Sequence, residues 1–96
     1  LKRANLKNVD LRWAILKNSD FTDSDMRSTR LLEANISGAL LVRANVSDGD
    51  LRRTNLSGAS LVGANLSGSN LAMADLTGAD IDDVSFGTCN IYGTKF

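Results

Sequence analysis

The sequence predicts an all-β solenoid, a β-helix in which the chain turns a corner every five residues and completes about five four-sided coils of twenty residues each. Three observations predict this fold. A large apolar residue occupies every fifth position, a small residue stands two positions before almost every one of them, and charges of opposite sign recur twenty residues apart. No linker or proline-rich break interrupts the pattern, so residues 1–96 are predicted to form a single domain.

The apolar series defines the predicted interior. Five residues rotate by about 500° in an α-helix, so successive side chains would drift around its axis. In a strand, an odd spacing places successive side chains on opposite faces. Only a chain that bends once per repeat can turn the whole series inward. The series is Leu1, Leu6, Leu11, Leu16, Phe21, Met26, Leu31, Ile36, Leu41, Val46, Leu51, Leu56, Leu61, Leu66, Leu71, Leu76, Ile81, Phe86, Ile91 and Phe96.

The other repeat positions have equally regular compositions. Small residues such as Ala4, Ala34 and Ala64 alternate with the large ones, so we expect both kinds to point inward. Asn or Asp stands between them in most repeats, as at Asn5 and Asp25. These residue types favour turns because their side chains hydrogen bond to nearby backbone groups. The two remaining positions are mostly polar or Gly and are predicted to be outward corner residues.

Several repeats closely match a known consensus. Ala-Asn-Leu-Lys-Asn at 4–8, Ala-Asn-Leu-Ser-Gly at 64–68 and Ala-Asp-Leu-Thr-Gly at 74–78 resemble the pentapeptide-repeat family, whose consensus is Ala-(Asp/Asn)-Leu-x-x. The resemblance covers essentially the whole chain. It implies a right-handed, four-sided parallel β-helix with one repeat per side.

Charge alone also indicates four sides. Residues stacked on adjacent coils lie about 4.8 Å apart, where like charges are destabilising. At a spacing of twenty, six charged pairs have opposite signs and one has like signs, whereas at fifteen one pair is opposite and four are alike. The spacing of twenty is therefore favoured. Its opposite pairs are Arg3/Asp23, Asp23/Arg43, Asp10/Arg30, Arg30/Asp50, Glu33/Arg53 and Asp75/Lys95.

Composition argues against catalysis. The chain has no His, which removes Ser-His and Cys-His pairs and an ordinary zinc site. It also lacks the glycine motifs that cradle phosphates. The single Cys, Cys89, stands at an inward small position and is expected to pack. We therefore expect no enzyme activity, no cofactor, no metal and no small-molecule substrate.

Departures from the repeat mark a candidate partner-binding surface. In the twenty-residue register, one side carries two outward columns rich in residue types that are enriched at protein interfaces. The columns read Arg12, Leu32, Arg52, Ala72, Tyr92 and Trp13, Glu33, Arg53, Met73, Gly93. The candidate residues are Arg12, Trp13, Leu32, Arg52, Arg53, Met73 and Tyr92.

Other features leave alternatives open. The side at residues 17–18, 37–38, 57–58 and 77–78, which we place opposite the candidate surface, is plain polar surface. A second apolar departure is Val42 stacked on Val62, next to Leu40. Trp13 and Ile15 fit equally well as residues that pack under a missing N-terminal cap.

Two classes of function are consistent with this sequence. The first is a non-catalytic scaffold that presents columns of side chains to another protein, as solenoids commonly do. The second is implied by the resemblance: a DNA mimic that binds a type II topoisomerase (gyrase) and gives quinolone resistance. Mimicry requires an acidic surface, whereas the net charge is zero and Arg12, Arg52 and Arg53 would repel a DNA-binding cleft. A further alternative implied by the resemblance is a repeat module of a secreted bacterial effector.

Nucleic acid is not an expected partner either, because no extensive basic patch with interleaved aromatic residues is present. Charge is nevertheless unevenly spread. Ten basic and seven acidic residues give +3 over residues 1–53, and one basic and four acidic residues give −3 over residues 54–96. This dipole along the rod could orient a partner.

Both ends of the sequence stop within the pattern, and the last residue, Phe96, is itself an apolar position. Open coils expose apolar surface and unpaired strand edges. We therefore expect a piece of a longer protein, or ends covered by a partner, including a second copy stacked end to end.

No segment is long or apolar enough to span a membrane, and no secretory signal is visible. The cytoplasm is the default localisation, with a secreted effector as the alternative.

Overall fold

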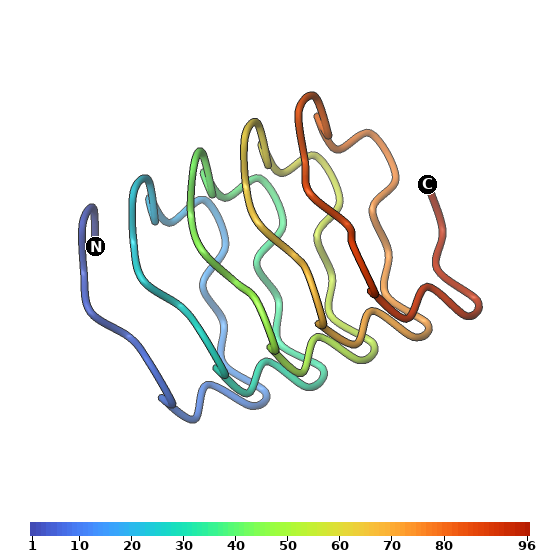
Figure 1. The fold of residues 1–96 in the computed structure, drawn as a ribbon, viewed down its shortest axis with the longest axis horizontal. Coiled ribbons are helices and arrows are strands. Elements are labelled where there is room, and N and C mark those ends of the chain that lie inside the picture. Colours follow the sequence, from blue (N-terminus) through green and yellow to red (C-terminus); the bar gives the residue numbers. More distant parts are fainter.

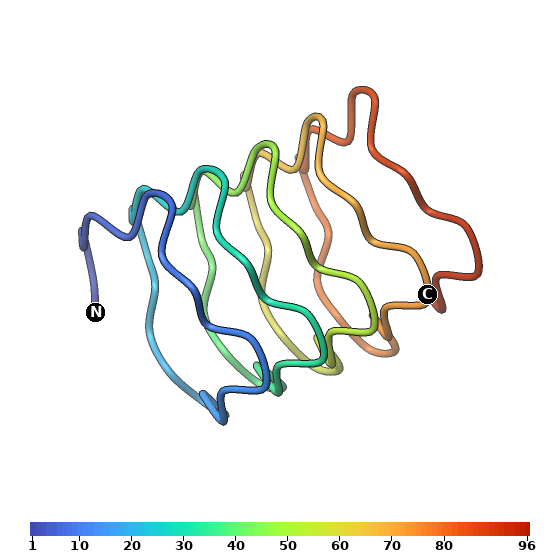
Figure 2. The same ribbon diagram turned by 90° about the horizontal axis from the view of Figure 1, so that it is seen from below.

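The computed structural model describes all 96 residues as a stack of coils, each formed by twenty residues. Fifteen parallel bridges join residues twenty apart, from Asn5↔Asp25 at one end to Asp75↔Lys95 at the other. The coils follow one another along the molecule, with the two termini at opposite ends (Figures 1 and 2). The coil length that was predicted from the charge pattern is therefore confirmed.

Every repeat contains one tight turn. The carbonyl of the large apolar residue accepts a hydrogen bond from the N–H three residues later, as from Val9 to Leu6 at 3.1 Å. The third residue of the turn has a positive φ in every repeat but one, for example 64° at Asn8 and 68° at Gly38. This hydrogen bond and this φ are those of a type II turn. The two outward positions of each repeat therefore form the corners of the coil, as predicted.

The structure contains no helix, and its strand pairing is limited to isolated single-residue bridges. Two of the five residues on each side form the turn, so that only the Asn/Asp position bridges to the coils on either side. Backbone hydrogen bonds then run between coils: Leu31 N–H donates to the Asp50 carbonyl at 2.7 Å, and Asn35 N–H donates to the Ala14 carbonyl at 2.9 Å. The all-β fold is thus built from narrow ladders rather than from extended strands.

One turn, at residues 86–89, departs from this geometry. Its second residue, Gly87, has a φ of 43°, whereas Thr88 at the third position does not have a positive φ. A β-branched residue strongly disfavours positive φ, and Gly does not. The ladder of backbone hydrogen bonds that joins the corners of successive coils is interrupted at this point. Asp48 N–H donates to the Ser67 carbonyl at 3.0 Å, but Gly68 N–H makes no equivalent bond to the Gly87 carbonyl.

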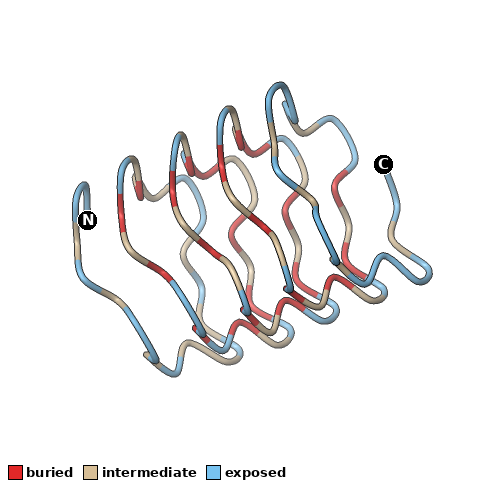
Figure 3. Ribbon diagram, in the orientation of Figure 1, coloured by how far each residue is buried: buried red, intermediate tan, exposed pale blue.

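The core occupies the middle coils (Figure 3). Leu31, Leu51 and Leu71 are fully buried, and small residues such as Ala34 fill the space between them. In the first and last coils, which have a neighbour on one side only, the apolar positions are less well covered. The exposed ones are Leu1 at 62%, Ile81 at 36%, Ile91 at 50% and Phe96 at 59%. The prediction of an apolar interior is therefore confirmed for the central coils but not for these four residues.

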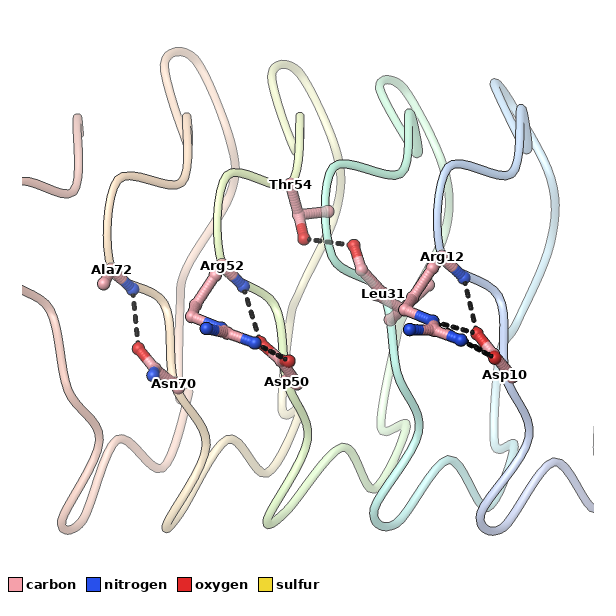
Figure 4. A network of polar contacts seen from close by, with 8 residues as sticks. All are labelled: Asp10, Arg12, Leu31, Asp50, Arg52, Thr54, Asn70 and Ala72. Atoms are coloured by element: carbon pink, nitrogen blue, oxygen red, sulfur yellow. Dashed lines mark hydrogen bonds and ion pairs between the residues drawn. The ribbon is translucent and has the colours of Figure 1, made fainter.

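Buried hydroxyl groups within the core all have partners. The Thr54 hydroxyl donates to the carbonyl of Leu31 on the preceding coil at 2.8 Å (Figure 4). Thr29 and Ser69 donate to carbonyls of their own turns, at 2.8 and 2.6 Å. No buried side-chain nitrogen or oxygen lacks a hydrogen bond, so these polar residues are accommodated without the desolvation cost of an unmade bond.

No helix in the structure could span a membrane.

Candidate functional site

The seven predicted partner-binding residues lie on one corner of the coil. We call this the Trp13 corner, and it comprises residues 12–13, 32–33, 52–53, 72–73 and 92–93. Backbone hydrogen bonds hold successive turns of the corner in register, for example from Trp13 N–H to the Leu32 carbonyl at 3.0 Å and from Met73 N–H to the Tyr92 carbonyl at 2.8 Å. The structure therefore brings all seven residues into one continuous edge.

The side chains of the Trp13 corner differ in accessibility. Trp13 is 60% exposed, Met73 51% and Tyr92 77%. Arg52 and Arg53 are exposed as well, whereas Arg12 and Leu32 are half-buried. Large apolar side chains at both ends of the edge are thus free to contact another molecule.

The plain polar surface at residues 17–18, 37–38, 57–58 and 77–78 is adjacent to the Trp13 corner, not opposite to it. Each coil has four turns, and residues 12–13 and 17–18 belong to consecutive turns. The opposite corner lies two repeats away, at residues 2–3 and their stacked equivalents. The earlier placement was wrong because it did not take account of the order in which the four turns follow one another.

Two arginines of the Trp13 corner are fixed by aspartates of their own repeats. Arg12 donates from Nε and Nη2 to the Asp10 carboxylate at 2.9 and 2.7 Å, and Arg52 makes the same fork with Asp50 at 2.8 and 2.7 Å (Figure 4). Each aspartate also accepts a hydrogen bond from the backbone N–H of its arginine, at 3.1 and 3.2 Å. The charges of these two arginines are therefore compensated within the chain.

The ion pairs shift the pKa values of these groups. Two hydrogen bonds from Arg12 lower the pKa of Asp10 from 3.8 to about 2. The bond from the Arg12 side chain has the larger effect, and the bond from its backbone N–H has the smaller one. Arg27 acts in the same way on the pKa of Asp25, which also falls to about 2. The pKa of Asp50 is lowered, chiefly by the side-chain hydrogen bond from Arg52. All three carboxylates remain charged at neutral pH.

Only one of the six predicted cross-coil pairs forms an ion pair. Arg43 Nε lies 2.8 Å from Asp23 Oδ1. Arg30 does not pair with Asp10 or Asp50, because Arg12 and Arg52 already occupy those carboxylates. The remaining pairs, Arg3/Asp23, Glu33/Arg53 and Asp75/Lys95, form no ion pair either. The charge pattern thus predicted the register but not the pairing.

The Trp13 corner carries large side chains at positions where Gly would be less strained. Trp13, Glu33, Arg53 and Met73 have φ values of 62°, 56°, 56° and 63°. For a residue with a side chain, this left-handed conformation costs roughly 1–2 kcal/mol, and Gly avoids the cost. The adjacent corner has Asn or Gly at each equivalent position. Non-Gly residues at other corners, such as Arg3, Asp23 and Arg43, have the same conformation, so it is a property of the repeated turn and not of this corner alone.

Two local contacts orient the apolar side chains of this corner. The guanidinium of Arg12 lies 5.1 Å from the centre of the Trp13 ring, within cation–π distance. The sulfur of Met73 lies over Gly93 and fills the space that a side chain would need at that position. The absence of a side chain at Gly93 therefore gives Met73 room to lie against the next turn of the corner.

Residues outside the Trp13 corner contribute less to a candidate binding surface. Ile15 is 82% exposed and Leu40 43%, while Val42 and Val62 are half-buried. Cys89 Sγ lies 3.4 Å from Ser69 Oγ at an inward position, in keeping with the packing role expected of it. The structure has no pocket and no group of residues that could hold a metal ion.

Sequence reasoning missed the pairing of Arg12 and Arg52 with carboxylates two residues before them. The signal was present as Asp-x-Arg at residues 10–12, 25–27 and 50–52. An Asp that caps the turn places its carboxylate next to the residue two positions later, as Asn70 does for the backbone N–H of Ala72 at 3.0 Å (Figure 4). An arginine at that later position is then within reach.

Comparison with known proteins agrees with the resemblance seen in the sequence. A family model described as pentapeptide repeats matches overlapping stretches of the chain, namely residues 4–41, 33–58, 39–77, 50–87 and 59–96. No curated protein sequence matches the chain.

Three solved structures are similar over almost the whole chain. A pentapeptide repeat protein from the Arabidopsis thaliana thylakoid lumen is 31% identical with a TM-score of 0.93, over 97% of this chain and 65% of that protein. One from the cyanobacterium Cyanothece is 35% identical with a TM-score of 0.91, over 93% and 60%. HetL from the cyanobacterium Nostoc, described as involved in heterocyst differentiation regulation, is 31% identical with a TM-score of 0.82, over 98% and 47%. The chain thus spans less than two thirds of the length of each of these proteins.

Proposed function

This chain belongs to the pentapeptide repeat family, and on that premise we propose that it is a non-catalytic scaffold for protein–protein interaction. The scaffold is a single-domain, right-handed, four-sided parallel β-helix that presents the Trp13 corner to a partner protein. The TM-scores of 0.93 and 0.91 to solved members of the family support this fold.

One observation carries the proposal. The exposed side chains Trp13, Arg53, Met73 and Tyr92 stack along one edge of a regular backbone. Trp, Tyr and Arg are the types that contribute most to binding when truncated in other interfaces, and Met is also enriched there. The inter-coil hydrogen bonds fix the spacing of these residues, so a partner would meet a preorganised edge and little ordering would be lost on binding.

Mimicry of DNA is the less favoured alternative. The net charge of the chain is zero, and Arg53 on the Trp13 corner has no acidic partner. A surface that replaces a nucleic-acid duplex has to present dense negative charge. Capture of topoisomerase subunits in the experiment below would favour mimicry over the scaffold.

The test is affinity capture from a cell lysate with the immobilised chain. The test variant is Trp13→Ala with Arg53→Glu, and the control is Lys17→Glu, which changes the net charge equally on the adjacent corner. We expect a specific protein to bind the wild-type chain and the control but not the test variant. Circular dichroism should show that all three are folded. Equal capture by the test variant, or a wild-type chain that neither captures a specific protein nor self-associates through this corner, would contradict the proposal.

A further inference from the structure

We propose that the partner of the Trp13 corner is a second copy of this chain, packed antiparallel about a twofold axis. The inference rests on the proposed function, because it names the partner that binds at the same surface. The axis lies between the second and third coils and crosses the stacking direction at right angles. Such an arrangement is isologous, so each contact occurs twice.

The order of side chains along the edge is self-complementary. Trp13, Glu33, Arg53 and Met73 occupy the same turn position in four successive coils. Read in the opposite direction, the order becomes Met, Arg, Glu, Trp. When the twofold axis passes between Glu33 and Arg53, each Glu33 faces Arg53 of the second copy. Each Trp13 then faces Met73 of the second copy, and a thioether sulfur packs favourably against an aromatic ring.

The charges required for this pairing are available. Glu33 and Arg53 form no ion pair within the chain, although they are stacked on adjacent coils. Asp23 and Arg43, which have the same spacing on the opposite corner, are already paired at 2.8 Å. The stacked Asp23/Arg43 pair is thus satisfied within the chain, whereas Glu33 and Arg53 are free to pair with another molecule.

The charge of the whole rod favours the same orientation. Residues 1–53 carry ten basic and seven acidic residues, a net charge of +3, and residues 54–96 carry one basic and four acidic residues, a net charge of −3. Antiparallel packing places the positive half of one copy beside the negative half of the other, whereas parallel packing places like halves together. Electrostatic complementarity of this kind steers association and suppresses the wrong orientation.

The flat side between the Trp13 corner and the adjacent corner at residues 17–18, 37–38, 57–58 and 77–78 has the same residues in the second and third coils. Asn35 matches Asn55, and the Ser-Gly turn at residues 37–38 matches the one at 57–58. Across the proposed axis these short residues face their equivalents, so the two backbones can approach closely. Farther from the axis, Ile15 faces Asp75 of the second copy, a pair without complementarity. The contact is therefore centred on the second and third coils.

The size of the contact sets the expected affinity. Four opposed coils at about 4.8 Å each give an edge about 19 Å long. An edge of this length, together with the one flat side beside it, buries less than the roughly 800 Å² per partner of a standard stable interface. We therefore expect a weak dimer that forms at high protein concentration. Because its charges are exposed, added salt should weaken it.

The test is sedimentation velocity of the purified chain over a concentration series at low and high salt. We expect a monomer–dimer equilibrium whose dissociation constant rises about tenfold or more in Glu33→Arg and in Arg53→Glu, because like charges then oppose each other. The double variant should restore the homodimer, and an equimolar mixture of the two single variants should form a heterodimer. Lys7→Glu, an exposed position on the corner at residues 7–8 that lies away from the opposed flat side, is the matched control and should self-associate like the wild-type chain.

Three results would overturn the inference: a monomer at every concentration, a dimer unaffected by the single reversals (as end-to-end stacking would give), or a double variant that does not reassociate. Circular dichroism of each variant separates loss of pairing from loss of fold. A monomeric chain that still captures a different protein through the Trp13 corner would remove self-pairing and leave the proposed scaffold function standing. A charge-dependent homodimer without other captured proteins would support self-pairing.

Discussion

Asp23 and Arg43 are twenty residues apart in the sequence and are joined by two hydrogen bonds, of 2.8 and 3.1 Å, between adjacent coils. The hydrogen bond from Arg43 lowers the pKa of Asp23, with a smaller contribution from the charge of Arg3 on the other neighbouring coil. Asp23 therefore lies between two arginines in one stacked column, and its charge favours this register over the alternatives.

Replacing Asp23 with Arg should lower the thermal stability of the chain, because three arginines would then stack in successive coils at residues 3, 23 and 43. The loss should shrink in high salt, which screens exposed charges. Thermal unfolding at low and high salt measures both effects. Asp48→Arg is the matched control, since Asp48 occupies the same turn position between Ser28 and Gly68. Equal losses in both variants would contradict a role for the charged column.

Acid should destabilise the fold between about pH 4 and pH 2. The pKa values of Asp10 and Asp25 fall from 3.8 to about 2 in the folded chain, through hydrogen bonds from Arg12 and Arg27. A carboxyl whose folded-state pKa is lowered stabilises the fold above its unfolded-state pKa, and this contribution is lost as the pH falls through the folded-state value. The free energy of unfolding should therefore decrease as the pH falls through this range.

The same ion pairs can be tested residue by residue with NMR. Arg12→Gln should raise the pKa of Asp10 toward its ordinary value, whereas Lys17→Gln, which removes a cation without a bound carboxylate, should leave it unchanged. The pH dependence of the Asp10 carboxyl resonance reports the result. An Asp10 that titrates near 3.8 in the wild-type chain would contradict the pairing seen in the structure.

Leu51→Ala should lower the free energy of unfolding by about 2–5 kcal/mol, because Leu51 is fully buried in the central coils. Leu51→Asp should unfold the chain, since it buries an unpaired charge. Denaturant titrations followed by circular dichroism measure both. Trp13→Ala is the control, because Trp13 is 60% exposed and its loss should change stability little. A folded Leu51→Asp chain would refute the inward register.

Replacing the two middle residues of the unusual turn, Gly87-Thr88, with Ser-Gly should repair the interrupted ladder. Gly87→Ser with Thr88→Gly places Gly at the third position, where the other turns have a positive φ. The carbonyl of residue 87 should then accept a hydrogen bond from Gly68 N–H. Hydrogen exchange of the Gly68 amide should slow relative to the wild-type chain, while the Gly58 amide, already bonded to Thr77 at 2.9 Å, should not change. Unchanged exchange at Gly68 would contradict this explanation.

Much of the fold could be predicted because the conformation of each repeat depends on its own five residues and the same pattern recurs along the chain. Asn5 and Asp75 both cap the turns that follow them, through backbone hydrogen bonds of 3.3 and 2.9 Å, as their residue types suggest. The departure at Thr88 was also visible in the sequence, as a β-branched residue where most turns have Gly or a polar residue. Its consequence, the unbonded Gly68 amide, required the position of the neighbouring coil.

The candidate site was predicted in position but not in detail. The twenty-residue spacing placed Trp13, Arg53 and Met73 on one edge, and the structure confirms that placement. Their contacts were not predictable, because the side chain of Met73 rests on Gly93 and the guanidinium of Arg12 stacks on Trp13 only once the backbone positions are fixed.

The sequence by itself determined the coil length, the inward columns and the four corners. A period of five with matching charges at twenty leaves one way to bury the apolar residues without opposing like charges. Only the tertiary structure determined which oppositely charged residue each charged side chain pairs with. Asp10 had both Arg12 and Arg30 within its neighbourhood, and it bonds to Arg12 at 2.7 Å. Periodicity determines which residues are neighbours, but the geometry of the turn and of each side chain determines which neighbours make contact.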